Sequence, residues 1–152
     1  MPFQNENTFL TFQQEGTEDK FHAAFEDAIK TVNDSLGGIY PLIIDGEEVE
    51  AEESFDVNSP IDEDVVLGAF AKGNREHVNQ AVAAAKDAFD TWRTTGYEER
   101  ASLFEKVADI VAERKFELGA TMTFENGKNR TEALADVDEA IDFLRFYAQE
   151  LR

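Results

Sequence analysis

The chain has 152 residues, of which 42% are hydrophobic and 13 are Phe, so it has enough apolar mass for the core of a single domain. Its 33 acidic and 14 basic residues give a formal net charge of −19, which makes nucleic acids and anionic membrane surfaces repulsive partners. It contains no cysteine, which excludes disulfides, thiolate metal sites and a thiol nucleophile within these residues.

The strong acidity has two explanations that the sequence leaves open. A dense carboxylate surface is typical of a highly soluble cytosolic protein, and it also suits a protein that works in high salt, where charges are screened over a few ångströms. No apolar run approaches the roughly 20 residues that span a bilayer, and the amino terminus lacks the basic and apolar parts of a signal peptide. We therefore expect a cytoplasmic protein without a membrane segment.

The first part of the chain is expected to form an arm followed by a helix. Residues 1–16 are polar with a few apolar anchors, which predicts an extended arm that lies across a larger body. Thr17 is a candidate N-cap, and apolar residues then recur at helical spacing until Gly37-Gly38. His22 lies one position off this apolar stripe, with no other histidine or cysteine nearby. We expect it at the surface and not in a metal site.

The middle of the chain has the pattern of short strands. Residues 40–44 run into Asp45-Gly46, a strong hairpin signal, and residues 47–50 return, which predicts a β-hairpin. Two further strands are expected over residues 55–60 and 64–71. Such short strands need helices on one face. The expected fold class is therefore α/β with α+β character, in which helices pack on a small hairpin and strand region.

Helical periodicity resumes at Asn74, a good N-cap, and predicts a helix that ends at Thr94-Thr95-Gly96. Further helices are expected from Tyr97 to about Lys115, from Leu118 to Phe124, and after a turn at residues 125–128. Two sets of apolar residues follow helical spacing in the last helix: Leu134, Val137, Ile141, Leu144, Ala148 and Leu151 in one, and Ala133, Ala140, Phe143 and Tyr147 in the other. We therefore expect this helix to be covered from more than one side.

Motifs that would carry chemistry are missing from the sequence. Neither the G-x-G-x-x-G nor the G-x-x-x-x-G-K-[ST] phosphate-binding pattern occurs, and no serine lies in a nucleophile elbow. The carboxylates of the last helix, Asp136, Asp138, Glu139 and Asp142, are no denser than this composition produces elsewhere. The residues alone therefore predict no catalytic or metal site.

Several stretches, in their order along the chain, resemble the amino-terminal region of the aldehyde dehydrogenase superfamily. They are residues 40–47 (YPLIIDGE), 58–60 with 65–68, 78–92, 99–104, 124–128 and 135–143. The residues before Tyr40, the stretch DVDEAIDF at 136–143 and the Phe146-Tyr147-Ala148 that follows resemble the 1-pyrroline-5-carboxylate dehydrogenases, also called L-glutamate γ-semialdehyde dehydrogenases. The resemblance implies a division into an arm and helix, residues 1–38, and an incomplete aldehyde dehydrogenase domain, residues 39–152.

The resemblance also implies an activity, the NAD-dependent oxidation of glutamate semialdehyde to glutamate in proline catabolism. The complete enzyme acts on a small-molecule aldehyde and forms homo-oligomers. In this family a cysteine thiolate attacks the aldehyde, and an asparagine and a backbone amide hold the oxyanion. The chain has no cysteine, and it ends before the segment in which the oxyanion asparagine, the cofactor-binding lysine and the glycine-rich turn would follow. No catalytic, NAD-binding or metal-binding residue is therefore assigned in it.

One residue is carried over from the resemblance. Glu139 matches a glutamate that lies near the mouth of the substrate pocket in this subgroup, and the alternative is an exposed carboxylate on an acidic helix. For Phe143 and Phe146 we expect core packing, and the alternative is an approach to the substrate tunnel. The chain as a whole is expected to be an amino-terminal fragment that is inactive by itself. Two alternatives remain: a non-catalytic interaction or assembly module derived from the family, and part of an aldehyde dehydrogenase with another substrate.

Overall fold

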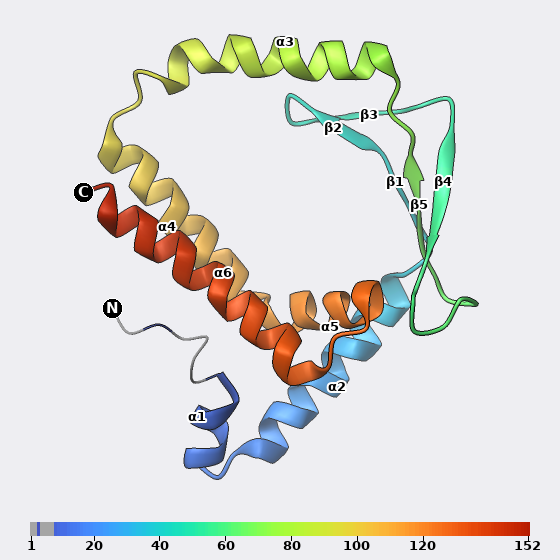
Figure 1. Cartoon of the computed structure of the whole chain (residues 1–152), viewed down its shortest axis with the longest axis vertical. Coiled ribbons are helices and arrows are strands. Elements are labelled where there is room, and N and C mark those ends of the chain that lie inside the picture. Colours follow the sequence, from blue (N-terminus) through green and yellow to red (C-terminus); the bar gives the residue numbers. More distant parts are fainter. Residues whose placement is uncertain (1–2, 4–7) are drawn as a thin grey trace. The chain divides into compact units, whose positions relative to one another are not determined.

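The structure, a computed structural model, describes residue 3 and residues 8–152 of the chain. In chain order the described elements are α1 (Thr8–Gln14), α2 (Glu18–Ser35), β1 (Gly38–Tyr40), β2 (Leu42–Ile44), β3 (Glu47–Val49), β4 (Ser54–Asn58), β5 (Val66–Ala71), α3 (Arg75–Trp92), α4 (Tyr97–Glu113), α5 (Lys115–Asn126) and α6 (Arg130–Glu150) (Figure 1). They form two compact units: a strand unit, Leu36–Thr95, and a helical unit, Met1–Ser35 with Gly96–Arg152.

The strand unit contains two small sheets. In one, β5 pairs in parallel with β1 and antiparallel with β4, so the strand order is β1-β5-β4. In the other, β2 and β3 form an antiparallel hairpin around Asp45-Gly46. Asp45 and Gly46 have φ angles of 55° and 78°, the positive values that a two-residue type I′ turn requires. The predicted hairpin is confirmed.

One predicted strand is divided in the structure. The sequence predicts a single strand over residues 40–44, but Tyr40 ends β1 and Leu42 begins β2, and the two strands belong to different sheets. Pro41 lies between them. Because proline has no amide hydrogen to donate to a ladder, the chain leaves one sheet there and enters the next.

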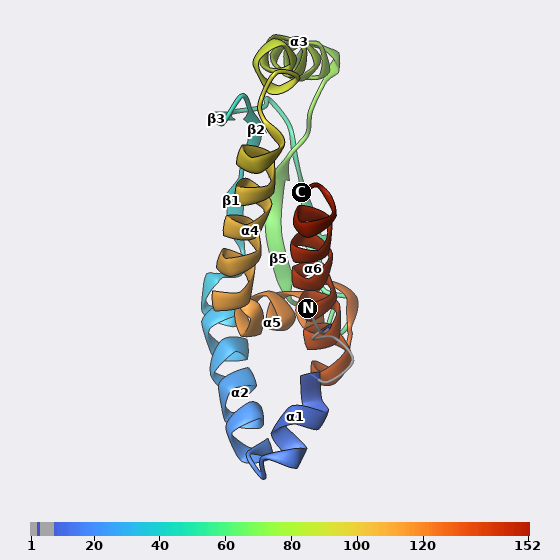
Figure 2. The same ribbon diagram turned by 90° about the vertical axis from the view of Figure 1, so that its left-hand side faces the viewer.

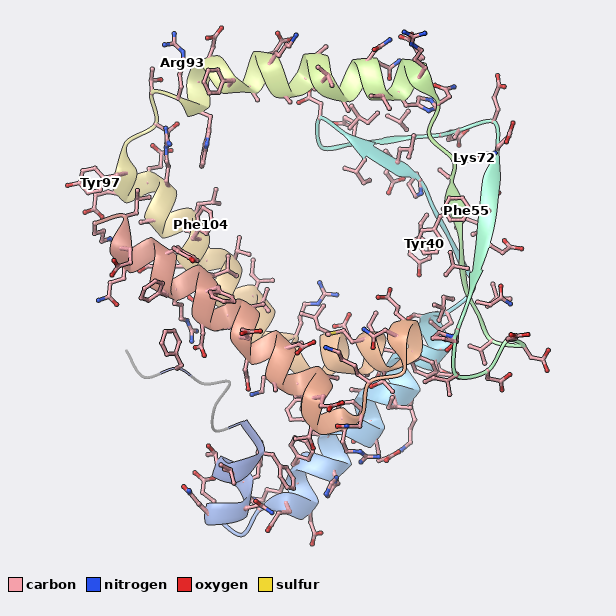
Figure 3. All side chains as sticks on the ribbon, viewed as in Figure 1. Tyr40, Phe55, Lys72, Arg93, Tyr97 and Phe104 are labelled. Carbon is pink, nitrogen blue, oxygen red and sulfur yellow. The ribbon has the colours of Figure 1, made fainter. Side chains whose placement is uncertain are left out.

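A row of aromatic residues crosses the three-stranded sheet. Phe70 on β5 is the register partner of both Tyr40 and Phe55, which come from the two flanking strands (Figure 3). The Tyr40 ring is stacked on Phe70, with ring centroids 4.8 Å apart. A Cβ atom on Gly68 would lie 2.4 Å from the Tyr40 ring. The absence of a side chain at Gly68 therefore makes room for this ring.

Helix α3 begins at the predicted N-cap, Asn74. The Asn74 side chain accepts a hydrogen bond from the His77 backbone amide, and His77 Nδ1 accepts one from the Asn74 amide, both at 3.1 Å. This reciprocal capping box gives His77 a structural role. α3 contacts the hairpin strand β2, and a shallow groove between the helix and the hairpin is lined by Ile43, Ile44, Asp45, Ala81, Ala84, Ala85 and Ala88. The expected packing of a helix on the hairpin is thus confirmed.

In the helical unit, α6 packs against α4 and α5, and α5 packs against α2 (Figures 1 and 2). The predicted turn before α6 is confirmed: Gly127 has a φ of 77° at the end of α5, and the Asn129 side chain accepts hydrogen bonds from Thr131 N and Glu132 N. At Gly119 of α5 an added Cβ would lie 3.1 Å from Leu134 and 3.5 Å from Phe25. Three helices therefore meet closely at this glycine.

The extended arm predicted for residues 1–16 is wrong over residues 8–14, which form α1. Phe9 and Phe12 lie three residues apart on this helix, and both rings contact Phe21 of α2, with centroids 5.0 and 5.2 Å away. Packing on a buried ring stabilises a helix that is too short to form on propensity alone. Thr17 precedes α2 as predicted, although its hydroxyl donates to the Phe12 carbonyl at 3.4 Å. Of the rest of the arm, residues 1, 2 and 4–7 lie outside the described residues.

Candidate functional site

Glu139, the residue that the sequence connects with a substrate pocket, lies on α6 with its side chain exposed. Its neighbours one and two turns further along the same side of the helix are Phe143 and Phe146, which are 49% and 40% exposed. Val137 and Ile141, which lie on the other side of α6, are buried against α4 and α5. Glu139 therefore lies on the face of α6 that points away from the core.

The exposed rings of α6 form one cluster. Phe143 and Tyr147 are stacked with centroids 6.0 Å apart, and Tyr147 meets Phe146 edge to face at 5.3 Å. Phe3 lies 5.9 Å from Phe146. We call Glu139, Phe143, Phe146 and Tyr147 the aromatic stripe. It combines a single carboxylate with a solvent-accessible apolar surface.

The positions of these rings correct the expectation that Phe143 and Phe146 pack in the core. In the second apolar set of α6, only Ala133 is buried, and Ala140, Phe143 and Tyr147 are exposed. In the first set Leu134, Val137, Ile141 and Ala148 are buried, whereas Leu151 is 44% exposed. The set that contains Val137 and Ile141 therefore packs in the core, whereas Phe143, Phe146 and Tyr147 remain 40–58% exposed although Phe3 lies beside Phe146.

Two carboxylates of α6 form ion pairs with lysines. Asp138 is 1% exposed and pairs with Lys115 of α5, whose Nζ lies 3.2 and 3.4 Å from the two carboxylate oxygens. Asp136 pairs with Lys128. Asp142 is also buried, at 6% exposure. No group of His, Cys, Asp and Glu side chains in the described part of the chain could hold a metal ion. Asp138 thus serves the packing of α6 on α5.

Sequence reasoning missed the Lys115–Asp138 pair because the two residues are 23 positions apart and belong to different helices. The available signal was the position of Asp138, directly after Val137 on the flank of the buried apolar stripe. A carboxylate at such a position needs a cationic partner from a neighbouring helix. His22 is exposed, as predicted, and its Nδ1 lies 3.2 Å from Nη1 of Arg130.

Arginine side chains also shift acid pKa values in the helical unit. Arg152 hydrogen-bonds both carboxylate oxygens of Glu105, at 2.6 and 2.9 Å, and these bonds lower the pKa of Glu105. The same guanidinium donates to Glu98 at 2.9 Å. Arg114 likewise lowers the pKa of Glu117 by hydrogen bonding. These ion pairs are exposed, and neither includes a residue of the aromatic stripe.

The turn from β5 into α3 is a place where α/β folds can bind a nucleotide, because a strand leads directly into a helix N-terminus. Here the Asn74 side chain already caps the helix. Lys72 pairs with Glu53 at 2.8 Å, and a shallow pocket at this turn is lined by Glu52, Glu53, Lys72, Gly73 and Asn74. Two carboxylates beside the turn would repel a pyrophosphate. This turn does not fit an NAD site.

Comparison with known proteins identifies the family to which the chain is similar. A model of the aldehyde dehydrogenase family matches residues 47–152. The chain is 41% identical over 150 residues to 1-pyrroline-5-carboxylate dehydrogenase 2 of Bacillus subtilis. This alignment covers 99% of this chain and 28% of that protein. The chain is also 41% identical over 150 residues to the 1-pyrroline-5-carboxylate dehydrogenase of Bacillus pumilus.

The fold also matches solved structures. One is the 1-pyrroline-5-carboxylate dehydrogenase from Thermus with bound NAD, at a TM-score of 0.81 and 40% identity, covering 84% of this chain and 25% of that chain. Another is proline utilization A from Bdellovibrio bacteriovorus, at a TM-score of 0.87 and 33% identity, covering 90% of this chain and 14% of that chain. The chain thus spans about a quarter of the length of the curated relatives that it matches. It belongs to the aldehyde dehydrogenase family.

Proposed function

We propose that the chain is the amino-terminal part of an NAD-dependent 1-pyrroline-5-carboxylate dehydrogenase, which oxidises glutamate semialdehyde to glutamate in proline catabolism. The match to the Bacillus subtilis enzyme over 99% of this chain carries the proposal. The complete enzyme acts on a small-molecule aldehyde in the cytoplasm as a homo-oligomer, and it binds neither nucleic acid nor membranes. Residues 1–38 precede the aldehyde dehydrogenase domain in this proposal, and residues 39–152 form the beginning of that domain.

The 152 residues supply a scaffold and no catalysis of their own. They contain no cysteine to attack an aldehyde, and the turn at Lys72–Asn74 does not fit the cofactor. We expect the purified chain to show no NAD-dependent aldehyde oxidation. Measurable turnover by this polypeptide would contradict the assignment.

Within this function, Glu139 lies near the mouth of the substrate pocket. Three observations support this position: the side chain is exposed, it makes no ion pair with the described residues, and Phe143 and Phe146 follow it on the same side of α6. A carboxylate on an apolar rim attracts the ammonium group of an amino-aldehyde and does not bind the aldehyde carbon. Its role would be substrate capture.

A chimera tests the proposal directly. In it, this chain replaces the matching 150 residues of the Bacillus subtilis enzyme, so that the relative supplies the rest of the fold. Glutamate semialdehyde and simple aliphatic aldehydes are then compared as substrates with NAD. We expect oxidation of glutamate semialdehyde with a kcat similar to that of the unmodified relative. A folded chimera that prefers another aldehyde would favour an aldehyde dehydrogenase of different specificity.

The second candidate function is a non-catalytic interaction module of the same family. The exposed apolar residues of α4 and α6 favour it, because such surfaces bind other polypeptides. This candidate predicts a chimera that folds but does not oxidise any of the aldehydes. The two functions are thus separated by the same measurement.

A further inference from the structure

Two dipeptides of the chain are chemically prone to ring closure, and the structure holds them in different ways. Asp45-Gly46 forms the turn between β2 and β3 (Figure 1), and Asn126-Gly127 lies at the end of α5. In both, the nitrogen of the glycine can attack the side-chain carbonyl carbon of the residue before it, because glycine has no Cβ atom that shields the nitrogen. In a flexible peptide the asparagine reacts faster, since an ionised carboxylate resists attack by a nucleophile.

The Asn126 site is closed in the folded chain. Gly127 N donates a hydrogen bond to the Thr123 carbonyl at 3.0 Å, and Oδ1 of Asn126 accepts one from Lys128 N at 3.1 Å. Attack by the Gly127 nitrogen requires its amide to leave Thr123, so the last turn of α5 must open first. Breaking one backbone hydrogen bond lowers the population of such an open state roughly tenfold. The fold therefore protects the more reactive dipeptide.

A further susceptible pair, Asn58-Ser59, is closed in the same way. Ser59 N donates to the Val65 carbonyl at 2.9 Å, and Ser59 is only 2% exposed. Its nitrogen is thus also held by a backbone hydrogen bond.

The Asp45 site is open. Asp45 and Gly46 are exposed, and the β2–β3 ladder ends at the pair Ile44 and Glu47. The Gly46 amide donates to no carbonyl of the described residues. The φ of 55° at Asp45 suits both a type I′ and a type II′ turn, which differ by a rotation of the peptide plane between residues 45 and 46. In the type II′ form the ψ of residue 45 is about −120°, which brings the Gly46 nitrogen toward Cγ of Asp45. The turn can reach this geometry without breaking the ladder.

We propose that Asp45-Gly46 is the site at which the folded chain is modified spontaneously, by conversion of Asp45 to isoaspartate, whereas Asn126 stays unmodified. The Gly46 nitrogen forms a bond to Cγ of the protonated side chain, and the carboxyl hydroxyl leaves as water with the amide proton, which gives a cyclic succinimide. Water then adds to the main-chain carbonyl of the ring, and the bond from that carbon to the Gly46 nitrogen breaks. The main chain now runs through Cβ and Cγ, and the α-carboxyl is free.

The product changes the hairpin. A two-residue turn sets the register in which Ile44 lies opposite Glu47. Isoaspartate adds a carbon atom to the main chain of this turn, so the turn no longer matches the distance between the strands. We therefore expect the modified chain to be less stable.

The experiment compares one dipeptide at two places in the same molecule. In the variant Asp45→Asn, residues 45–46 have the same sequence as residues 126–127, and the hairpin is expected to persist because Asn-Gly favours a type I′ turn. The variant is incubated folded and in concentrated urea, and peptide mass spectrometry measures deamidation. In the folded variant, residue 45 should deamidate roughly tenfold or more faster than Asn126, since only Asn126 requires a backbone hydrogen bond to break. In urea the two rates should converge.

The wild-type chain and a control variant complete the test. In the folded wild type, isoaspartate should accumulate at residue 45 before Asn126 changes, and in urea Asn126 should react first. The control variant Asn126→Gln has a longer side chain that closes a ring less readily. It should lose the reaction of residue 126 in urea and keep isoaspartate formation at residue 45. The separated isoaspartate form should have a lower Tm than the starting chain.

Three results would overturn the inference. The first is equal deamidation of residue 45 and Asn126 in the folded Asp45→Asn variant. The second is a folded wild-type chain that is modified at Asn126 or Asn58 before Asp45. The third is an isoaspartate form with an unchanged Tm, which would show that the hairpin tolerates the longer main chain. These outcomes do not depend on the activity of the complete enzyme, so they are independent of the proposed function.

Discussion

Lys115 Nζ lies 3.2 Å from Oδ1 of Asp138, and this ion pair joins α5 to α6 at a point where the aspartate side chain is only 2% exposed. Asp138 directly precedes Glu139 in the sequence, but it lies on the buried flank of α6. The ion pair therefore holds α6 against α5, and the aromatic stripe lies on the opposite face of α6.

Replacing Lys115 with Met should destabilise the helical unit, because it leaves the carboxylate of Asp138 buried beside an apolar side chain. Breaking a buried pair costs several kcal/mol, and since Lys115 is partly exposed we expect a loss of about 2–3 kcal/mol. Urea unfolding followed by circular dichroism measures it. The double variant Lys115→Met with Asp138→Leu removes both charges and should recover most of the loss. A double variant as unstable as the single one would show that the lysine stabilises by packing alone.

Gly68→Ala should disturb the aromatic row of the strand unit. The new Cβ would lie 2.4 Å from the Tyr40 ring, so the ring must leave its stacked position on Phe70. We expect a loss of about 1–2 kcal/mol, the usual effect of a steric clash in a packed site. Thermal unfolding and near-UV circular dichroism report the change. In a Tyr40→Ala background the same substitution should have almost no effect, and a full effect there would place the clash elsewhere.

The pair between Arg152 and Glu105 should make stability depend on pH in the acid range. Hydrogen bonds from Arg152 lower the pKa of Glu105 below its ordinary value of 4.5 in the folded chain. A lowered folded pKa contributes stability above the unfolded pKa, and this contribution is lost as the pH falls through the folded pKa. The difference in unfolding free energy between the wild type and Glu105→Gln should therefore be present at pH 7 and vanish in strong acid. A difference that persists at pH 2 would mean that the charge of Glu105 does not matter.

The net charge of −19 should make the protein more stable at high salt. Repulsion between exposed carboxylates opposes the compact state, and multimolar KCl shortens the screening length to roughly 3 Å or less. We expect the Tm to rise from low to multimolar KCl. As a matched control, Glu47→Lys, Glu48→Lys and Glu50→Lys together reverse charges on and beside β3 and should reduce the rise. A flat Tm in the wild type would show that the acidity serves solubility only.

Glu139→Gln tests the proposed place of this residue at the substrate pocket. In the chimera with the Bacillus subtilis enzyme, the loss of a carboxylate at the pocket mouth should raise KM for glutamate semialdehyde several-fold and leave kcat unchanged, since the residue assists binding and not chemistry. KM for an uncharged aliphatic aldehyde should not change. Equal kinetics for the wild type and the variant with both aldehydes would leave Glu139 as a solvated surface residue.

Local signals in the sequence were sufficient for the hairpin, the start of α3 and the turn before α6. Asp45-Gly46 predicts the hairpin and Asn74 predicts the start of α3, because turn and capping preferences depend on a few neighbouring residues. Gly127 marks the end of α5 for the same reason. The order of motifs along the chain also indicates the aldehyde dehydrogenase family.

The burial and exposure of the candidate site residues could not be predicted from the sequence, because they depend on contacts between residues that are distant in the chain. Helical spacing shows that α6 has two apolar sides, but only the tertiary structure shows that Ile141 is buried and Phe143 exposed, because burial depends on which helices this chain places against α6. The same holds for α1, which forms because Phe9 packs on Phe21, and for the partner of Asp138. The sequence by itself thus determined the hairpin and the helices after Asn74, through interactions over a few residues, and the order of its motifs indicated the family. The tertiary structure decided which faces are filled and which remain exposed, because filling a face requires residues from elsewhere in the chain.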